Sequence, residues 1–214
     1  IEPPPKPIIT LPLDKEVVAF PSIHIVGNAS QSTEVLLTVN GVDKYETKPD
    51  GQGNFVFKDI KISSEFNRGV NYLNVTARDQ MGDESEAENI SVKFNIAPEV
   101  KIVAPTKNET ISGAYTVKVG AEDKNKDGLT FTYEVSSDKG ENWVIVFGAV
   151  LKRQISWNTR DFADGEYLLR ITADDGFSKI QTTSDSFFIK NGLPKISFIG
   201  GGRDNTASGG YSIV

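Results

Sequence analysis

The chain has 214 residues, of which 38% are hydrophobic, and this length and composition suffice for one or two domains with apolar cores. The formal net charge is -6 at pH 7, so the sequence lacks the basic excess that binds nucleic acid or an anionic membrane surface. Because the chain contains no cysteine, disulfide bonds and thiolate metal sites are excluded, and apolar burial must hold each core.

A proline-rich run over residues 1–7 opens the chain and predicts a semi-rigid linker, because consecutive prolines favour an extended polyproline conformation. Residues 8–96 then carry short β-branched or alternating runs without a helical period of useful length. Turn-forming pairs such as Asn40-Gly41 and Asp50-Gly51 separate these runs, as in antiparallel hairpins. We expect one β-sandwich, with strands over 8–13, 23–29, 35–39, 54–60, 70–77 and 90–96.

A second unit is predicted over residues 97–191, opened by Pro98. Its strand-like runs match the seven strands of an immunoglobulin-like sandwich, and they cover 100–103, 115–121, 129–135, 143–146, 155–157, 167–173 and 187–189. Tyr167 follows Asp164-Gly165-Glu166 and precedes an inward-facing residue by two positions, which is the arrangement of a tyrosine corner. Asn71 takes the equivalent position in the first unit, and its amide can also bond the local backbone.

The chain repeats itself. Residues 165–176 show the same alternating pattern as residues 69–79, and residues 194–214 align without a gap on residues 98–118. We therefore expect residues 192–214 to be a linker and the first strands of a truncated third repeat, either disordered, swapped or paired with a neighbouring chain. The missing N-terminal leader likewise leads us to expect that the sequence was trimmed, and that any signal peptide or anchor lies outside it.

Motifs in both units resemble those of known extracellular modules. The first unit has Thr38-Val39-Asn40-Gly41, Gly53-x-Phe55 and Gly69-x-Asn71-x-Leu73-x-Val75-x-Ala77-x-Asp79. It resembles the bacterial Ig-like modules of the glucodextranase domain B type. The second unit has Trp157-Asn158-Thr159 and Asp164-Gly165-x-Tyr167-x-Leu169-Arg170-x-x-Ala173-x-Asp175-Gly176. It is similar to the fibronectin type III or Ig-like repeats of secreted bacterial and archaeal multidomain proteins.

The resemblance implies an all-β fold, with two tandem Ig-like antiparallel β-sandwiches followed by the start of the third. It also implies an extracellular or cell-surface location and neighbouring Ig-like repeats as partners. Modules of these families act mostly as spacers, stalks and adhesive arrays, or as accessory parts of secreted hydrolases. Fold alone does not choose among these roles.

The sequence Asp123-x-Asn125-x-Asp127-Gly128, followed by Glu134, satisfies the written calcium-loop pattern of helix-loop-helix proteins. The flanking runs alternate as strands, which places Glu134 in mid-strand and excludes that type of site. Two interpretations remain. The loop is a solvated turn, rich in the residues that turns favour, or it is a calcium site of another type.

The second interpretation has a geometric basis, because two loops of an Ig-like sandwich lie at the end where the preceding domain enters. There Asp123, Asn125 and Asp127 would face Asp174 and Asp175, with Glu99 of the linker nearby. Clustered carboxylates repel one another unless a hard cation neutralises them, and calcium takes six to eight oxygen ligands. Calcium, the one cofactor suggested by the sequence, would then stiffen the joint between the domains.

Other motifs favour structural interpretations. Residues 136–143 resemble an Asp-box hairpin, but one copy cannot build a propeller, so we expect Asp138 to bond the turn and Trp143 to pack over it. His24 is the only histidine, and with no second catalytic group beside it we expect a surface role. Asn74-Val75-Thr76 and Asn89-Ile90-Ser91 are two of the four matches to the N-glycosylation pattern.

We expect a non-enzymatic extracellular segment of Ig-like repeats, serving as a stalk, spacer or adhesive array of a cell-surface protein. Its partners would be the neighbouring repeats and a surface protein or glycan, with no nucleic acid and no membrane span. The alternative is an accessory, carbohydrate-binding module of a secreted hydrolase. Sugar binding needs exposed aromatic rings presented together, and the candidate platform is Trp143, Phe147, Trp157 and Phe162, whose spacing suits core packing equally well.

Overall fold

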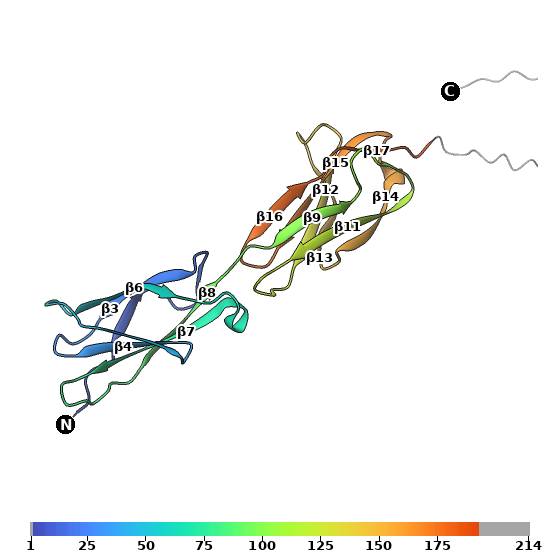
Figure 1. The fold of residues 1–214 in the computed structure, drawn as a ribbon. Coiled ribbons are helices and arrows are strands. Elements are labelled where there is room, and N and C mark those ends of the chain that lie inside the picture. Colours follow the sequence, from blue (N-terminus) through green and yellow to red (C-terminus); the bar gives the residue numbers. More distant parts are fainter. Residues whose placement is uncertain (1, 193–214) are drawn as a thin grey trace, which may run out of the picture.

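The computed structural model describes residues 2–192 and shows two β-sandwiches that lie end to end (Figure 1). The predicted start of a third repeat, residues 192–214, lies outside the described residues except for Gly192. Within the described part of the chain, no helix has the length and apolar composition needed to cross a membrane. The chain is all-β, as its alternating runs predicted.

The first sandwich consists of a three-stranded and a five-stranded sheet. The smaller sheet has the order β1 (Ile8–Leu11), β3 (Ser22–Asn28) and β6 (Asn54–Lys61). The larger sheet has the order β2 (Glu16–Val18), β8 (Glu88–Phe94), β7 (Val70–Arg78), β4 (Glu34–Val39) and β5 (Asp43–Thr47). The short strand β2 runs parallel to β8, and the other pairings are antiparallel.

Alternation along each strand builds the first core. On β4, Val35, Leu37 and Val39 are fully buried, whereas the residues between them lie on the outer face. The facing sheet contributes Phe55 and Phe57, whose rings meet edge to face at 5.8 Å. Side chains from both sheets therefore fill one apolar layer. The opposite face of β7 and β8 consequently forms part of the outer surface of the sandwich.

The second sandwich has the same two-layer construction. One sheet has the order β10 (Thr110–Ile111), β17 (Phe187–Ile189), β15 (Gly165–Asp174), β12 (Thr130–Ser136) and β13 (Val144–Val150), and β16 (Lys179–Thr183) also pairs with β15. The other sheet has the order β14 (Gln154–Asn158), β11 (Ala114–Glu122) and β9 (Glu99–Ala104). Strand β15 is the longest of the domain and pairs with three neighbours.

Aromatic side chains dominate the second core. Trp157 is buried, and its ring meets Phe162 at 5.1 Å and Phe187 at 6.3 Å, both edge to face. Tyr133 is also fully buried, and its hydroxyl donates to the carbonyl of Lys152 at 2.7 Å. Desolvation raises the pKa of Tyr133 to about 12, so the phenol stays neutral in the core.

The corner bonds expected from the sequence are present in both sandwiches. The hydroxyl of Tyr167 donates to the carbonyl of Ala163 at 3.0 Å, which ties the start of β15 to the preceding turn. In the first sandwich the amide of Asn71 donates to the carbonyls of Ser63 and Gly69, each at 2.8 Å, and accepts from the Ser63 N–H. Asparagine therefore replaces tyrosine at this corner with a similar structural effect.

Candidate functional site

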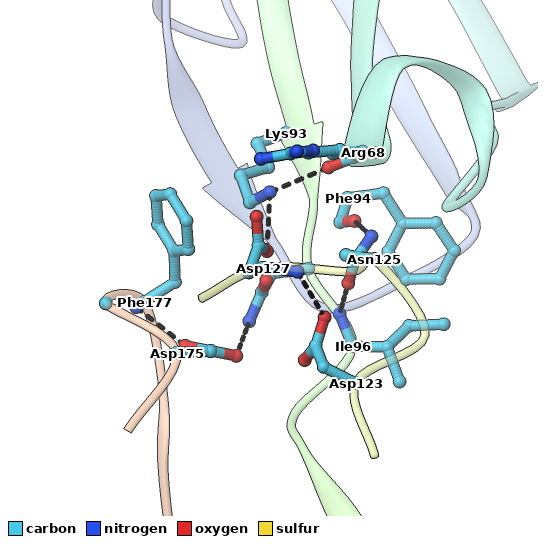
Figure 2. A network of polar contacts seen from close by, with 12 residues as sticks. Arg68, Lys93, Phe94, Ile96, Asp123, Asn125, Asp127, Asp175 and Phe177 are labelled. Atoms are coloured by element: carbon cyan, nitrogen blue, oxygen red, sulfur yellow. Dashed lines mark hydrogen bonds and ion pairs between the residues drawn. The ribbon is translucent and has the colours of Figure 1, made fainter. Parts of the chain in front are cut away.

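The polar residues of greatest interest lie at the joint between the two sandwiches. Strand β8 ends at Phe94, residues 95–98 form the linker, and β9 begins at Glu99. Three loops surround this linker: the short helix η1 (Phe66–Gly69) with its preceding turn, residues 123–129 between β11 and β12, and residues 175–178 between β15 and β16. Figure 2 shows how side chains from these loops meet around the end of β8.

Asn125 is the most deeply buried polar residue of the joint, with 1% of its surface exposed. Its amide nitrogen donates to the carbonyls of Ser64 at 2.8 Å and Phe94 at 2.9 Å, and its oxygen accepts from the Ile96 N–H at 2.7 Å. Both ends of the amide are thus used by backbone groups of the first sandwich and the linker. A loop of the second sandwich therefore holds the end of the first, and its hydrogen bonds can form only when the two sandwiches have this relative orientation.

An ion pair adds to this contact. The ammonium of Lys93 lies 2.9 Å from Asp127 Oδ2, with 8% and 12% of the two side chains exposed. The contact lies outside hydrogen-bond geometry at the carboxylate, so its strength is that of an ion pair. The same ammonium donates to the carbonyl of Arg68 at 2.7 Å and lies 4.4 Å from the ring centroid of Phe177. Lys93 thereby contacts both sandwiches at once.

The linker itself is held from the other side. The amide of Asn95 donates to Asp175 Oδ2 at 3.0 Å and to Ser178 Oγ at 3.1 Å, and Asp175 also accepts the backbone N–H groups of Phe177 and Ser178. Burial alone would raise the pKa of Asp175, but the hydrogen bonds from Asn95 and Ser178 outweigh it and hold the pKa below its usual value. Asp175 is therefore an ionised acceptor built into the joint.

Gly69 permits the close approach of these elements. Its φ of +84° lies in the left-handed region, and a Cβ added there would lie 2.4 Å from the Phe94 carbonyl oxygen and 2.5 Å from Asn125 Nδ2. No side chain larger than hydrogen fits between η1 and the Asn125 amide without displacing one of them. The sequence of η1 is thus adapted to the joint as well as to its own turn.

The structure brings together some of the predicted calcium ligands. Asn125, Asp127 and Asp175 lie at the joint, and Asp123 accepts the Asp127 N–H at 2.9 Å within the same loop. Asp174 is turned to Lys179 at 3.0 Å. Glu99 is exposed and lies 3.8 Å from Lys124. Lys93 already supplies a positive charge at Asp127. Within residues 2–192, no group of three or more acidic, histidine or cysteine side chains is placed to hold a metal ion. Calcium binding stays a prediction of the sequence. Of its candidate ligands, Asp123 and Asp127 each have a buried Oδ2 that lacks a hydrogen-bond partner in the described chain.

Sequence reasoning missed Lys93 of β8 and Asn95 of the linker, which both contact acidic side chains of the second sandwich. Lys93 alternates with Val92 and Phe94 on β8 and so has the pattern of an exposed position, yet the second sandwich covers it. One signal was available, since an asparagine precedes a proline by three residues in both linkers, at Asn95 and Asn191. The two asparagines have different hydrogen-bond partners. Asn191 donates to the Thr159 and Phe162 carbonyls within its own sandwich.

The Asp-box-like segment is a structural hairpin, as expected. Asp138 accepts from Ser136 Oγ at 2.6 Å and from the Asn142 N–H at 2.9 Å, and the indole N–H of Trp143 donates to the Gly140 carbonyl. The hydrogen bond from the Asn142 N–H is the largest of several that lower the pKa of Asp138 to about 2. These bonds close the turn, and both carboxylate oxygens of Asp138 take part in them.

The aromatic rings suggested for sugar binding do not form a platform. Trp157 and Phe162 contact each other in or against the core, and Phe147 meets Tyr133 edge to face at 6.3 Å. The guanidinium carbon of Arg170 lies 4.2 Å from the ring centroid of Trp143, and Arg170 Nε forms an ion pair with Glu134 Oε2 at 2.8 Å. The interpretation of these rings as packing residues therefore fits their positions.

The single histidine has a surface position, as expected. His24 is exposed, and its Nδ1 accepts the N–H of Asp59 at 3.1 Å. One ring nitrogen is thus used for a bond between β3 and β6.

Comparison with known proteins finds similar solved structures but no sequence relative. No family model and no curated protein sequence matches it. Among solved structures, the chain is similar to the fibronectin(III)-like modules of Clostridium thermocellum CbhA, at 17% identity and a TM-score of 0.38 over 86% of this chain and 94% of that one. It is also similar to extracellular domains 3–5 of Drosophila OTK, at 12% identity and a TM-score of 0.44 over 88% of this chain and 60% of that one.

A two-domain fibronectin type III segment of chicken tenascin is a further similar structure, at 11% identity and a TM-score of 0.37 over 86% of this chain and 99% of that one. At these values the likeness concerns the fold and says nothing of ligand or activity. The strand order of the described residues itself shows an all-β protein with two sandwich domains.

Proposed function

We propose that this chain is a non-enzymatic, extracellular spacer whose two sandwiches are held in one relative placement by the polar joint. It would serve as part of a stalk or adhesive array of a cell-surface protein, with neighbouring Ig-like repeats as its first partners. The single observation that carries this proposal is the burial of Asn125, whose three hydrogen bonds all cross from one sandwich to the other or to the linker.

The physical argument rests on what bending would expose. A rotation of one sandwich would break the Asn125 bonds and separate Lys93 from Asp127, leaving backbone groups and two charges without their present partners. Unpairing a buried polar group costs about 1–3 kcal/mol, and charged groups cost more. A four-residue linker that contains Pro98 allows little slack for alternative arrangements. The joint should therefore behave as a fixed connection.

Small-angle X-ray scattering tests the proposal on the whole fragment and on Lys93→Met, which removes the cation but keeps the length of the side chain. Lys44→Met is the matched control, because Lys44 is an exposed lysine on β5 of the same sandwich. We expect Lys93→Met to broaden the distribution of interatomic distances and Lys44→Met to leave it unchanged. Identical scattering from all three proteins, with both variants folded, would remove the proposal of a stiff joint.

A further inference from the structure

A shallow groove crosses the outer face of the five-stranded sheet of the first sandwich. Its volume is about 440 Å³, and it passes over β4, β7 and β8 towards the turn that precedes β2. Strand register sets its floor, because Thr38 lies opposite Asn74 and Asn74 lies opposite Asn89. Three uncharged polar side chains thus form a row across neighbouring strands, and this row is independent of the joint.

Tyr72 gives the groove an exposed aromatic ring, with 51% of its surface accessible. The ring is held in place, because its hydroxyl accepts from Asn67 Nδ2 at 2.9 Å and its edge meets Phe66 at 6.2 Å and 84°. A ring fixed in this way loses little conformational freedom when a ligand covers it. Such a surface suits stacking against the apolar face of a sugar ring.

The polar groups beside Tyr72 offer both donors and acceptors. Asn74 Nδ2 donates to Asn89 Oδ1 at 2.8 Å, and Asn89 Nδ2 donates one hydrogen to the Ala87 carbonyl at 3.3 Å. The pair can therefore still present the Asn74 oxygen and the second hydrogen of the Asn89 nitrogen to a ligand. Asp14 accepts both the N–H and the hydroxyl of Ser91 on Oδ1, and its Oδ2 can accept from a ligand hydroxyl. Sugar hydroxyls donate and accept at once, and they match this mixture.

The charges in the groove favour an uncharged ligand. Asp14 and Lys15 are adjacent and of opposite sign, and the other polar lining residues named above are neutral. We propose that this groove binds a neutral oligosaccharide, with Tyr72 stacking on a sugar ring while Asn74, Asn89 and Asp14 bond its hydroxyls. The spacer function does not depend on it, so either can fail without the other.

The test begins with a glycan array probed with the whole fragment, produced in a bacterial host without N-glycosylation because Asn74 and Asn89 begin glycosylation motifs. Neutral oligosaccharides that bind are then titrated by calorimetry. We expect Tyr72→Ala to weaken binding about tenfold or more, as removal of a central aromatic contact does. Tyr72→Phe, which keeps the ring, should bind within about twofold of the parent protein.

Phe20→Ala is the matched control, because Phe20 is 72% exposed and is not part of the groove. Its affinity should equal that of the parent. If Tyr72→Ala fails to fold, Asn89→Ala gives the same test from the other side of the groove, with a loss of about threefold or more expected. Absence of any neutral glycan from the array, binding of acidic glycans only, or unchanged affinity in Tyr72→Ala and Asn89→Ala would each overturn the proposal.

Discussion

Replacing Asn125 by alanine removes the most buried polar contact of the joint, and its effect can be worked out from the structure. The change deletes the bonds to the Ser64 and Phe94 carbonyls and the acceptor for the Ile96 N–H. A net hydrogen bond contributes about 1 kcal/mol. If water replaces part of what is lost, we expect opening of the joint to become about 2 kcal/mol easier.

Amide hydrogen exchange measures this change directly, because the Ile96 N–H is protected by Asn125 and exchanges when the joint opens. A change of about 2 kcal/mol corresponds to exchange about 30-fold faster, since 1.4 kcal/mol is a factor of ten. Core amides of β7 and β15 should keep their protection, because neither strand contributes to these bonds.

Asn142→Ala is the matched control. It removes an asparagine amide that bonds Asp138 at 2.7 Å in an exposed hairpin far from the joint. Exchange at Ile96 should not change in this variant. If Asn125→Ala folds and its Ile96 amide exchanges at the parent rate, then the buried amide does not hold the two sandwiches together, and the reasoning is refuted.

Four further outcomes are expected. Gly69→Ala should lower the melting temperature and broaden the scattering profile, because its Cβ would lie 2.4 Å from the Phe94 carbonyl oxygen; a parent-like melt and profile would show that the turn can yield. The pKa of Asp175 is lowered on folding, so its stabilisation is present above the unfolded value of 3.8 and is lost as pH falls through the folded value. Thermal melts across that acid range should therefore decline less steeply in Asp175→Asn than in the parent, and parallel curves would contradict this. Tyr167→Phe should cost about 1 kcal/mol in urea unfolding through loss of the Ala163 bond, and a smaller change than about 0.3 kcal/mol would show that the corner bond is dispensable. Scattering in millimolar calcium and in chelator should coincide, because an ammonium already faces the loop carboxylate; loosening on chelation would instead support the calcium site predicted from the sequence.

Alternating patterns predicted the long strands because each has one buried face. Strands such as β4 and β15 have strict alternation of buried and outer residues, and both were predicted within two residues of their ends. The strands β2, β5, β10 and β16 were missed. They are short, and β5 and β16 are largely exposed at sheet edges, where a two-residue hydrophobic period has no reason to develop.

The joint could be predicted only in part. The polar loop at residues 123–127 was noticed because the spacing of its oxygen-bearing side chains satisfies the written calcium-loop pattern. The residues of the first sandwich that contact this loop were not predicted. Whether Lys93 faces water or Asp127 depends on how one domain is placed on the other. A single sequence carries no periodic signal for such a placement. The aromatic groove residue Tyr72 was missed for a related reason, since strand pattern shows which face is outside but not what gathers there.

Asn95 and Asn191 stand at matching points of two linkers, yet they are used in opposite directions. Asn95 donates forward to Asp175 of the next sandwich, whereas Asn191 donates back to Thr159 and Phe162 of its own. Similar linker sequences therefore need not hold the same neighbour, because the side to which the asparagine amide donates decides which domain it stabilises.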